Sequence, residues 1–352
     1  MPQRRKSRKV KVGKLFIGGD APVTVQSMTT TDTTDVNATV DQIHGLEETG
    51  CDIIRVSAPT MESAKALKEI RENIAIPLVV DIHFDYRIAI EAVKYADKLR
   101  INPGNIGNAD KVEMVVKAAK DYGIPIRIGV NLGSLEKDLF DKHGYAPEAM
   151  VESAMRHVKI LEDLDFYDTI VSLKASDVLR MVQAYRLFAE KTDYPLHLGV
   201  TEAGSKIPGT VKSAMGIGML LSEGIGDTIR ISLSEEPKEE VKVGKQILRA
   251  LGLRNEGVQV TSCPTCARTN VDVIKLVEQL ENATDKIKKP IKVAVMGCAV
   301  NGPGESKKAD IGIVGAPGNH LLYKEGKIVR RINDNEVMEV LLKEINEMVN
   351  GN

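Results

Sequence analysis

Short apolar runs alternate with longer stretches of helical period from about residue 20 to residue 252. The short runs are rich in β-branched residues and predict strands over Val23–Met28, Asp52–Ser57, Leu78–His83, Lys98–Asn102, Ile126–Asn131, Thr169–Lys174, Leu196–Thr201 and Thr228–Leu233. The longer stretches predict helices over Val36–Thr49, Met61–Asn73, Ile88–Ala96, Asp110–Asp121, Pro147–Leu164, Asp177–Glu190, Gly209–Glu223 and Lys238–Leu251. Such an alternation indicates parallel βαβ units, and eight of them close a (β/α)₈ TIM barrel over residues 20–252.

A doubly wound open sheet is the competing architecture for this alternation. It usually carries a glycine-rich phosphate loop after its first strand. The first predicted strand leads instead into Ser27-Met-Thr-Thr-Thr31, with neither a GxGxxG pattern nor a P-loop lysine. The sequence therefore favours the barrel within the α/β class.

The pattern changes after Leu253. Residues 253–262 are short and polar and predict a linker, and residues 263–352 predict a small α+β domain. Its first helix is expected over Cys263–Ala283, entered through a Cys-Pro-Thr-Cys turn, and the glycine-rich loop Gly297–Gly304 follows a strand. The predicted strands and the closing helix of this domain are Ile291–Met296, Ile311–Gly315, His320–Lys324, Lys327–Ile332 and Asn335–Val349.

Composition narrows the class of protein. A length of 352 residues suits about two domains. The net charge of −1, the aromatic content of 4% and the absence of tryptophan argue against a nucleic-acid partner. No apolar run is long enough to span a bilayer, so no membrane partner is expected. Residues 1–19 are expected to be a basic N-terminal tail and lead-in, of which residues 1–14 should be solvated and poorly ordered.

Polar residues gather at the ends of the predicted strands, where the catalytic groups of a (β/α)₈ barrel lie. The candidates for substrate binding are Arg55, His83, Arg100, Arg127, Asn131, Lys174 and Arg230. Side chains alternate between the two faces of a strand, so up to five of these cations can point into one barrel mouth. Buried cations need neutralising, and arginine forks match phosphate oxygens. The pattern therefore indicates a ligand with several phosphates, although each arginine could instead pair with a carboxylate.

Asp81 and Glu202 are the main acids at the same strand ends. Asp81 could orient His83 or a cation. Glu202 lies among cations and is a candidate general acid. Its alternative role is that of a structural counter-ion to Lys174 or Arg230.

Three of the four cysteines lie within the last hundred residues, which suggests metal or redox chemistry in a reducing, cytoplasmic compartment. Cys263 and Cys266 have the two-residue spacing that lets both sulfurs face one metal centre, and Cys298 lies in the glycine-rich loop. Three thiolates fit a [4Fe–4S] cluster in which one iron takes Glu305 or a substrate oxygen. Cys51 is expected to be a small buried apolar residue.

The chain closely resembles the bacterial 4-hydroxy-3-methylbut-2-enyl diphosphate synthases, iron–sulfur enzymes of the methylerythritol phosphate route to isoprenoids. The resemblance runs from about Gly13 to the end of the chain, without the extra domain that some members insert. It rests on the motifs Val25-Gln-Ser-Met-Thr29, Gly50-Cys-Asp-Ile-Ile-Arg-Val56, Asp81-Ile-His83, Arg100-Ile-Asn-Pro-Gly104, Arg127-Ile-Gly-Val-Asn131, Thr201-Glu-Ala-Gly204, Leu221-Ser-Glu-Gly-Ile-Gly-Asp-Thr228, Cys263-Pro-Thr-Cys266 and Asn301-Gly-Pro-Gly-Glu305.

This resemblance implies an oxidoreductase that opens the ring of 2-C-methyl-D-erythritol 2,4-cyclodiphosphate with two electrons and loss of water, giving 4-hydroxy-3-methylbut-2-enyl diphosphate. It implies Glu202 as the acid that helps water leave. The residues implied for the diphosphate are Arg55, Arg100, Arg127, Asn131 and Lys174, with less secure roles for His83 and Arg230. The ligands implied for a [4Fe–4S] cluster are Cys263, Cys266, Cys298 and Glu305, of which Glu305 gives way during turnover.

The resemblance also implies partners. Electrons would come from ferredoxin or flavodoxin. The protein would be a homodimer in which the cluster domain of one subunit caps the barrel of the other, so the active site is shared. An open cationic mouth needs such a cover to exclude water.

Two other functions fit parts of the pattern. In one, the barrel binds phosphate and the three cysteines hold a structural zinc with Glu305. In the other, the barrel mouth and the basic tail bind RNA or another anion, which predicts a steep salt dependence and no need for Cys298.

Overall fold

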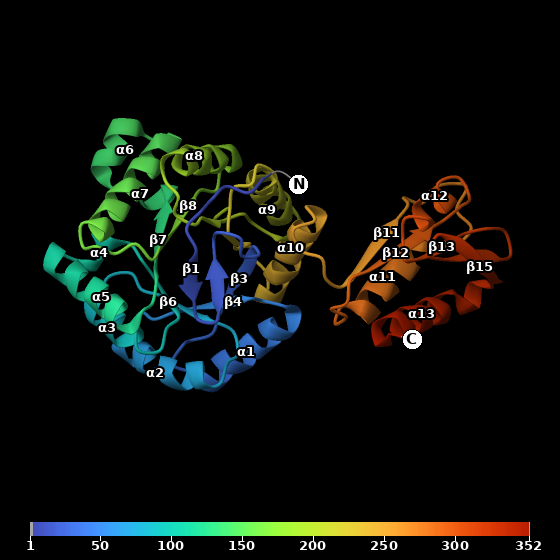
Figure 1. The fold of residues 1–352 in the computed structure, drawn as a ribbon, viewed down its shortest axis with the longest axis horizontal. Coiled ribbons are helices and arrows are strands. Elements are labelled where there is room, and N and C mark those ends of the chain that lie inside the picture. Colours follow the sequence, from blue (N-terminus) through green and yellow to red (C-terminus); the bar gives the residue numbers. More distant parts are fainter. Residues whose placement is uncertain (1–2, 352) are drawn as a thin grey trace. The chain divides into compact units, whose positions relative to one another are not determined.

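Eight parallel strands surround the axis of the first part of the chain in the computed structural model, which describes residues 3–351 (Figure 1). They follow the order β8-β7-β6-β5-β4-β3-β10-β9, and a parallel bridge between Val171 and Leu196 joins the two edges into a ring. The strands are β3 (Thr24–Met28), β4 (Ile53–Ser57), β5 (Leu78–Asp81), β6 (Lys98–Ile101), β7 (Ile126–Asn131), β8 (Thr169–Lys174), β9 (His197–Leu198) and β10 (Thr228–Ile229). The predicted (β/α)₈ barrel is confirmed.

Helices cover the outside of this ring (Figure 1). The main ones are α1 (Val36–Thr49), α2 (Met61–Glu72), α3 (Tyr86–Ala92), α5 (Ala109–Tyr122), α7 (Pro147–Glu162), α8 (Val178–Lys191), α9 (Lys206–Ser222) and α10 (Pro237–Ala250). Short pieces lie between them: α4 (Pro103–Ile106), η1 (Leu132–Ser134) and α6 (Lys137–His143). Helix α9 begins three residues before the predicted Gly209, because the first turn of a helix tolerates Pro208, which has no N–H to donate.

Alternate residues of the strands face the helices and the barrel axis. Valine, isoleucine and leucine face the helices, and they form the large apolar core of the unit. The axial positions carry many polar groups, such as Arg55 on β4, Arg100 on β6 and Lys174 on β8, all buried. The apolar contact with the helices supplies the main burial free energy, so the axial face is left available for chemistry.

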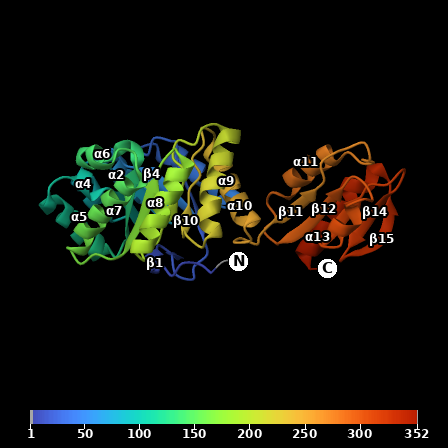
Figure 2. The same ribbon diagram turned by 90° about the horizontal axis from the view of Figure 1, so that it is seen from above.

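The N-terminal segment closes one end of the barrel. Strands β1 (Val10–Val12) and β2 (Leu15–Ile17) form an antiparallel hairpin, and the segment lies at the lower edge of the barrel in Figure 2. The hairpin packs against axial residues of the barrel strands, Ile53, Val79 and Ile170. The apolar contact seals the end opposite the strand ends.

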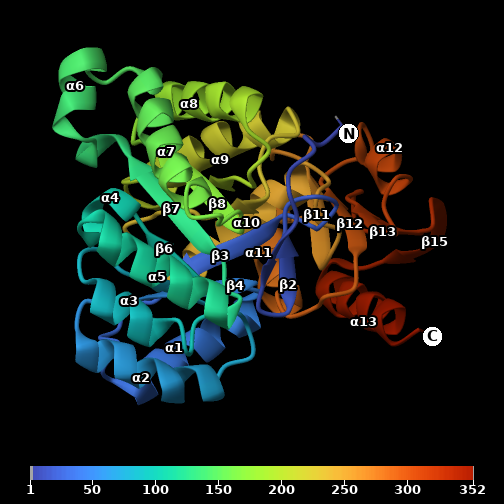
Figure 3. The same ribbon diagram turned by 60° about the vertical axis from the view of Figure 1, so that its left-hand side comes forward.

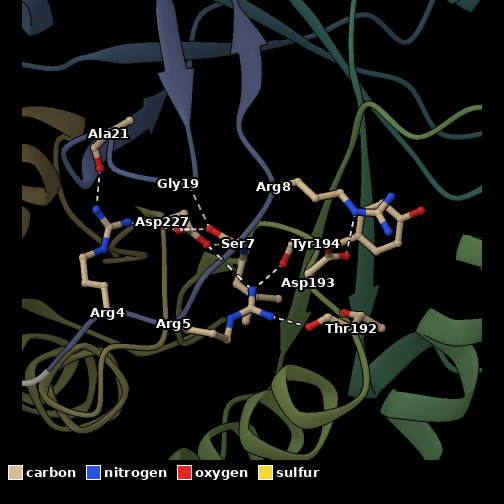
Figure 4. A network of polar contacts seen from close by, with 11 residues as sticks. Arg4, Arg5, Ser7, Arg8, Gly19, Ala21, Thr192, Asp193, Tyr194 and Asp227 are labelled. Carbon is tan, nitrogen blue, oxygen red and sulfur yellow. Dashed lines mark hydrogen bonds and ion pairs between the residues drawn. The ribbon is translucent and has the colours of Figure 1, made fainter.

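The residues before the hairpin are held by polar contacts (Figure 4). Arg4 and Ser7 donate to one carboxylate oxygen of the buried Asp227 at 3.0 and 2.8 Å. Arg8 lies over the ring of Tyr194, 4.1 Å from its centroid. The prediction of a solvated, poorly ordered tail over residues 1–14 was therefore wrong for residues 4–14. The basic side chains find carboxylates and an aromatic ring far away in the sequence; residues 1 and 2 lie outside the described part.

A five-stranded sheet forms the second compact unit, which begins at Asn255, one residue after the barrel unit ends at Arg254. Its strands follow the order β11 (Val258–Ser262), β12 (Ile291–Met296), β13 (Ile311–Val314), β14 (His320–Lys324) and β15 (Lys327–Ile332). The other elements are α11 (Val273–Thr284), α12 (Gly302–Ser306), η2 (Asp334–Glu336) and α13 (Val337–Asn350) (Figure 3). Helices α11 and α13 share one apolar core with the sheet, as expected for a small α+β domain.

Two expectations about this unit were wrong. The predicted linker 253–262 includes the edge strand β11, because Val258–Ser262 pair in parallel with Ile291–Val295. The helix predicted over Cys263–Ala283 begins only at Val273, where the Asp272 side chain accepts from the Lys275 N–H and caps it. The cysteine motif therefore lies in the segment between β11 and α11 and not at the start of a helix.

Within residues 3–351, no helix combines the length and the apolar character that crossing a membrane requires.

Candidate functional site

A cavity of about 190 Å³ opens among the strand ends of the barrel. Its lining residues are Arg55, Asp81, His83, Arg100, Arg127, Asn131, Ser172, Lys174, Thr201, Arg230 and Ser232. All seven residues expected to bind substrate are in this set, and Glu202 is not. Five of the lining side chains are Arg or Lys and one is a carboxylate, so the cavity suits an anionic ligand.

Asp81 lies at the centre of the charged groups on one side of the cavity. Its carboxylate accepts from Arg100 Nη1 at 3.0 Å and lies 3.9 Å from Arg55 Nε and 3.6 Å from His83 Nε2. Both possibilities expected for Asp81, contact with a histidine and contact with a cation, occur together. Because one carboxylate serves two guanidinium groups, it neutralises them only in part.

Two glycines make room for the long cations. A Cβ atom at Gly129 would lie 2.5 Å from Arg100 Nε, and one at Gly199 would lie 2.8 Å from Lys174 Nζ. Arg100 also donates to the Gly129 carbonyl at 3.2 Å. Side chains at these two positions would push both cations away from their places along the cavity wall.

A second carboxylate, to which the sequence did not point, supports the cavity at Arg230. Glu240 on α10 is buried and lies 3.6 Å from Arg230 Nη2. Its other oxygen accepts from the Ser27 hydroxyl at 3.1 Å, and the first oxygen also accepts from the Leu233 N–H at 3.1 Å. Residue 240 lies on a helix, so the alternation of faces along a strand could not reveal it.

Glu202 directly follows Thr201, which lines the cavity, but its own side chain is exposed. Its backbone has a positive φ of 52°, which is uncommon for a residue with a side chain. Such backbone strain is found preferentially at functional sites.

The cysteine loops adjoin each other at the ends of parallel strands. Cys263 directly follows β11, and Cys298 follows β12, its parallel neighbour, by two residues. The Gly297 N–H donates to Cys263 Sγ at 3.1 Å, and the Asn270 N–H donates to the Gly297 carbonyl at 2.8 Å. These contacts join the two loops, and none of the three cysteines is in a disulfide.

Glu305 lies on α12, in the loop that follows Cys298, and its carboxylate lies 3.1 Å from Lys308 Nζ. The Gly302 N–H donates to the Cys298 carbonyl at 3.2 Å, so this short helix continues from the cysteine loop. Across residues 3–351, no three His, Cys, Asp or Glu side chains are close enough to hold a metal ion. The expected ligands therefore lie on neighbouring loops and do not surround one point.

Comparison with known families decides the relationship. The GcpE TIM-barrel domain matches residues 7–245, and the GcpE protein C-terminal domain matches residues 259–347. The chain belongs to the GcpE family. The gap between the two matches includes the boundary of the compact units at Arg254 and Asn255.

Bacterial proteins resemble this GcpE chain over nearly its whole length. The 4-hydroxy-3-methylbut-2-en-1-yl diphosphate synthase (flavodoxin) of Caldanaerobacter subterraneus subsp. tengcongensis is 58% identical over 348 residues, 98% of each chain. The protein of the same name from Bacillus subtilis is 58% identical over 344 residues, 97% of this chain and 91% of its own. The family resemblance expected from the motifs is confirmed.

Solved structures share the barrel of the GcpE chain. A dihydropteroate synthase from Stenotrophomonas maltophilia has a TM-score of 0.51 at 15% identity, over 70% of this chain and 98% of its own. A phospho-2-dehydro-3-deoxyheptonate aldolase from Thermotoga maritima has a TM-score of 0.50 at 10% identity, over 70% and 73%. At such identities the likeness supports the fold alone.

Crowding of cations dominates the electrostatics of the GcpE barrel. Burial, followed by the positive charge of Arg230, lowers the pKa of Arg55 to about 9. Burial and the neighbouring arginines hold the pKa of Lys174 well below its usual range. Burial alone would raise the pKa of Asp81, but the close contact with His83 and the charges of Arg55 and Arg100 hold it far below its ordinary range. The excess of positive charge in the site therefore favours the binding of an anion.

Replacing Asp81 by asparagine should destabilise the GcpE barrel by about 3–5 kcal/mol, since it leaves buried guanidinium groups unpaired. The lowered pKa means that this stabilisation is present above about pH 4, the ordinary range for Asp, and disappears as the pH falls. Urea unfolding of wild type and variant between pH 3 and pH 7 measures the difference, which should shrink toward pH 3.

The exposed pair of Asp85 and Arg87 provides the control. Asp85→Asn should cost less than about 1 kcal/mol at neutral pH, because solvent screens this pair. Equal effects of the two substitutions would contradict the central role of Asp81.

Proposed function

We propose that this protein opens the ring of 2-C-methyl-D-erythritol 2,4-cyclodiphosphate with two electrons, releasing water and 4-hydroxy-3-methylbut-2-enyl diphosphate. The observation that carries the proposal is the cavity lined by five cations in a chain of the GcpE family. Relatives 58% identical have the name 4-hydroxy-3-methylbut-2-en-1-yl diphosphate synthase (flavodoxin). Their names lend no support to the zinc alternative.

The diphosphate is the part of the substrate that the cavity suits. Arg55, Arg100 and Arg127 would bind its oxygens through guanidinium forks, and Lys174 would add a point charge. Asn131 and His83, which line the same cavity, would offer hydrogen bonds, and Arg230 would act from the side that Glu240 supports. These contacts would fix the ring so that its reacting carbon atoms face out of the barrel.

Glu202 would donate the proton with which water leaves. It directly follows Thr201 at the cavity, and its strained backbone holds it outside the set of side chains that contact the phosphates. A carboxylic acid in this position could protonate the departing oxygen without competing for the arginines.

A [4Fe–4S] cluster would supply the electrons, with Cys263, Cys266, Cys298 and Glu305 as its ligands. The donor set fits, because thiolates are the ligands of such clusters and the cysteine loops adjoin at the ends of β11 and β12. Glu305 would be the replaceable ligand. Flavodoxin, which the names of the relatives include, would be the electron donor, with ferredoxin as the alternative.

The direct test is anaerobic purification followed by metal analysis and turnover. About four irons and four sulfides per chain would support the cluster. Reduced flavodoxin together with the cyclic diphosphate should then yield 4-hydroxy-3-methylbut-2-enyl diphosphate. One zinc per chain with no sulfide, or no product from a fully loaded protein, would overturn the proposal. An affinity for RNA that falls steeply with salt and persists without Cys298 would favour the other alternative.

Thr269 should strengthen cluster binding, because its side chain holds the CxxC loop in place. Its hydroxyl accepts from the Cys266 N–H at 3.0 Å, and its side chain lies against Gly297, where a Cβ atom would be 3.0 Å from its Cγ2. Thr269→Val keeps the shape and removes the acceptor, and it should lower cluster affinity about 10-fold. Iron release to a chelator measures this without turnover.

Thr269→Ser is the matched variant, because it keeps the hydroxyl and removes the methyl group. It should release iron at close to the wild-type rate. Equal release from the valine variant and from wild type would contradict the role of the hydrogen bond.

The proposal includes a homodimer in which each active site joins the barrel of one subunit to the cluster unit of its partner. The cationic cavity and the cysteines lie in different units of the chain, so the reaction needs both units. Glu202→Gln and Cys298→Ser subunits, each inactive alone, should regain activity when mixed and allowed to exchange, because one of the two sites is then intact. Size-exclusion chromatography would report the dimer. A mixture without activity, despite exchange of subunits, would contradict the shared site.

None of the four cysteines is in a disulfide. A cytoplasmic location remains a prediction.

A further inference from the structure

A second layer of polar side chains lies along the barrel axis beneath the cavity. Lys98 precedes Arg100 on β6 by two residues and therefore shares its axial face. The Lys98 side chain is fully buried, and no group in residues 3–351 accepts a hydrogen bond from its Nζ. Gln26 on β3 and His197 on β9 are also buried, and their side-chain nitrogens likewise have no partner in the same residues. None of the three lines the cavity.

Lys98 is enclosed from below by apolar groups. Its register partner on β5 is Val79, which belongs to the apolar cluster formed with the N-terminal hairpin. The ammonium group therefore cannot reach water at the closed end of the barrel. A buried, unpaired ammonium costs several kcal/mol, unless the group gives up its proton.

The charged groups in and beside the cavity, beneath which Lys98 lies, are mostly positive. On the strands and helices of the barrel they are Arg55 (β4), Arg100 (β6), Arg127 (β7), Lys174 (β8) and Arg230 (β10), against the carboxylates Asp81 (β5) and Glu240 (α10), with His83 and His197 also titratable. Guanidinium groups keep their protons in proteins. The lysines are therefore the groups that lose a proton. Burial and the charges of Arg127 and Arg55 hold the pKa of Lys98 well below its usual range.

Binding of a cyclic diphosphate ester reduces the excess of positive charge that keeps Lys98 neutral. Each phosphorus atom has one strongly acidic oxygen, so the ligand brings negative charge on both phosphates and has no proton of its own to exchange near neutral pH. Its charges offset those of Arg55 and Arg127, the same arginines that oppose a charge on Lys98.

We infer that Lys98 is neutral in the ligand-free protein and takes up a proton when the cyclic diphosphate enters the cavity, so that substrate binding is coupled to proton uptake. This inference rests on the proposed function for the identity of the ligand. No atom of Lys98 needs to contact the ligand, and the lysine acts as a charge that appears only when the phosphates are present. The advantage is a cavity that is less positively charged when no ligand is bound.

The sign of the pH dependence follows from linkage. Between the pKa of Lys98 in the ligand-free protein and its pKa in the complex, binding takes up about one proton, so the affinity falls about 10-fold for each unit of rising pH. Below that window the lysine is already charged, and the affinity no longer changes because of Lys98.

The test is isothermal titration of the anaerobic holoenzyme, without reductant, with the cyclic diphosphate. Titrations at one pH in HEPES and in Tris, which differ in ionisation enthalpy, give the number of protons taken up. Wild type should take up about one proton more than Lys98→Met near neutral pH. Lys98→Gln serves as a second variant without the amine. Gln26→Met is the matched control, because it also removes a buried polar group from the axis, and it should take up as many protons as wild type.

Binding with no proton uptake by wild type would overturn the inference, as would equal uptake by wild type and both Lys98 variants, since Lys174 or a histidine would then be the acceptor. Failure of the proposed function is distinguishable, because in that case the cyclic diphosphate does not bind to wild type at all.

Discussion

Cys298→Ser is expected to abolish turnover and to remove most of the iron, while the barrel stays folded. Cys298 is the one cysteine of the second loop, so its loss leaves Cys263 and Cys266 without a third thiolate. Serine is isosteric but remains protonated at neutral pH, and a hydroxyl is a poor ligand for iron in a cluster. Turnover should fall below detection, because electrons no longer reach the substrate.

The fold and the ligand affinity of the barrel should not change in Cys298→Ser. Cys298 belongs to the second compact unit, and the apolar cores of the two units contain different residues. Circular dichroism and calorimetric titration with the cyclic diphosphate would report a folded barrel that still binds its ligand. Iron, sulfide and the rate of product formation complete the measurement.

Cys51→Ser is the matched control for this substitution. Cys51 is buried in the barrel, its thiol donates to the Ile53 carbonyl at 3.1 Å, and burial raises its pKa to about 12. A serine there can keep the hydrogen bond, so cluster content and turnover should remain near wild type. Retained turnover in Cys298→Ser would show that three thiolates are not needed.

Glu202→Gln is expected to keep the cluster and substrate binding but to lower kcat by about 10²–10⁴, the range typical of a lost general acid. The amide has nearly the shape of the acid and no proton to donate. Since Glu202 is exposed and does not line the cavity, its loss should leave the affinity for the cyclic diphosphate within a few-fold of wild type.

Glu325 provides a control in the same backbone conformation. It has a positive φ of 48°, close to the 52° of Glu202, and it lies in the turn between β14 and β15. Glu325→Gln should leave both kcat and stability near wild type. Near-normal turnover of Glu202→Gln under the same conditions would remove Glu202 as the acid.

The local periodicity of apolar residues was sufficient to predict the main features of the fold. The change between strand and helix patterns predicted the (β/α)₈ barrel, and the strand ends pointed to Arg55, Arg100 and Arg127, which now line one cavity. The same reasoning could have found Ser172 and Lys98, which precede Lys174 and Arg100 by two residues. Alternation is a property of each strand by itself, so it can be read without knowledge of the rest of the chain.

Features that depend on distant partners could not be read in this way. The N-terminal residues looked like a solvated tail because their partner Asp227 lies 220 residues beyond Ser7. Residues 258–262 looked like a linker because their pairing with β12 is set by the folding of the second unit. A polar segment is ordered when its hydrogen bonds are made elsewhere in the chain, and its own composition contains no sign of this.

The sequence by itself determined the barrel, the set of cations at its strand ends and the spacing of the cysteines, because each depends on residues close together in the chain. Only the tertiary structure decided the electrostatic balance of the site. It brought Glu240 to Ser27 across 213 residues, placed Asp81 between two arginines, and buried Lys98 with no hydrogen-bond partner among residues 3–351. Burial and counter-ions set the charge of each of these groups, and both depend on the packing of all the strands around one axis.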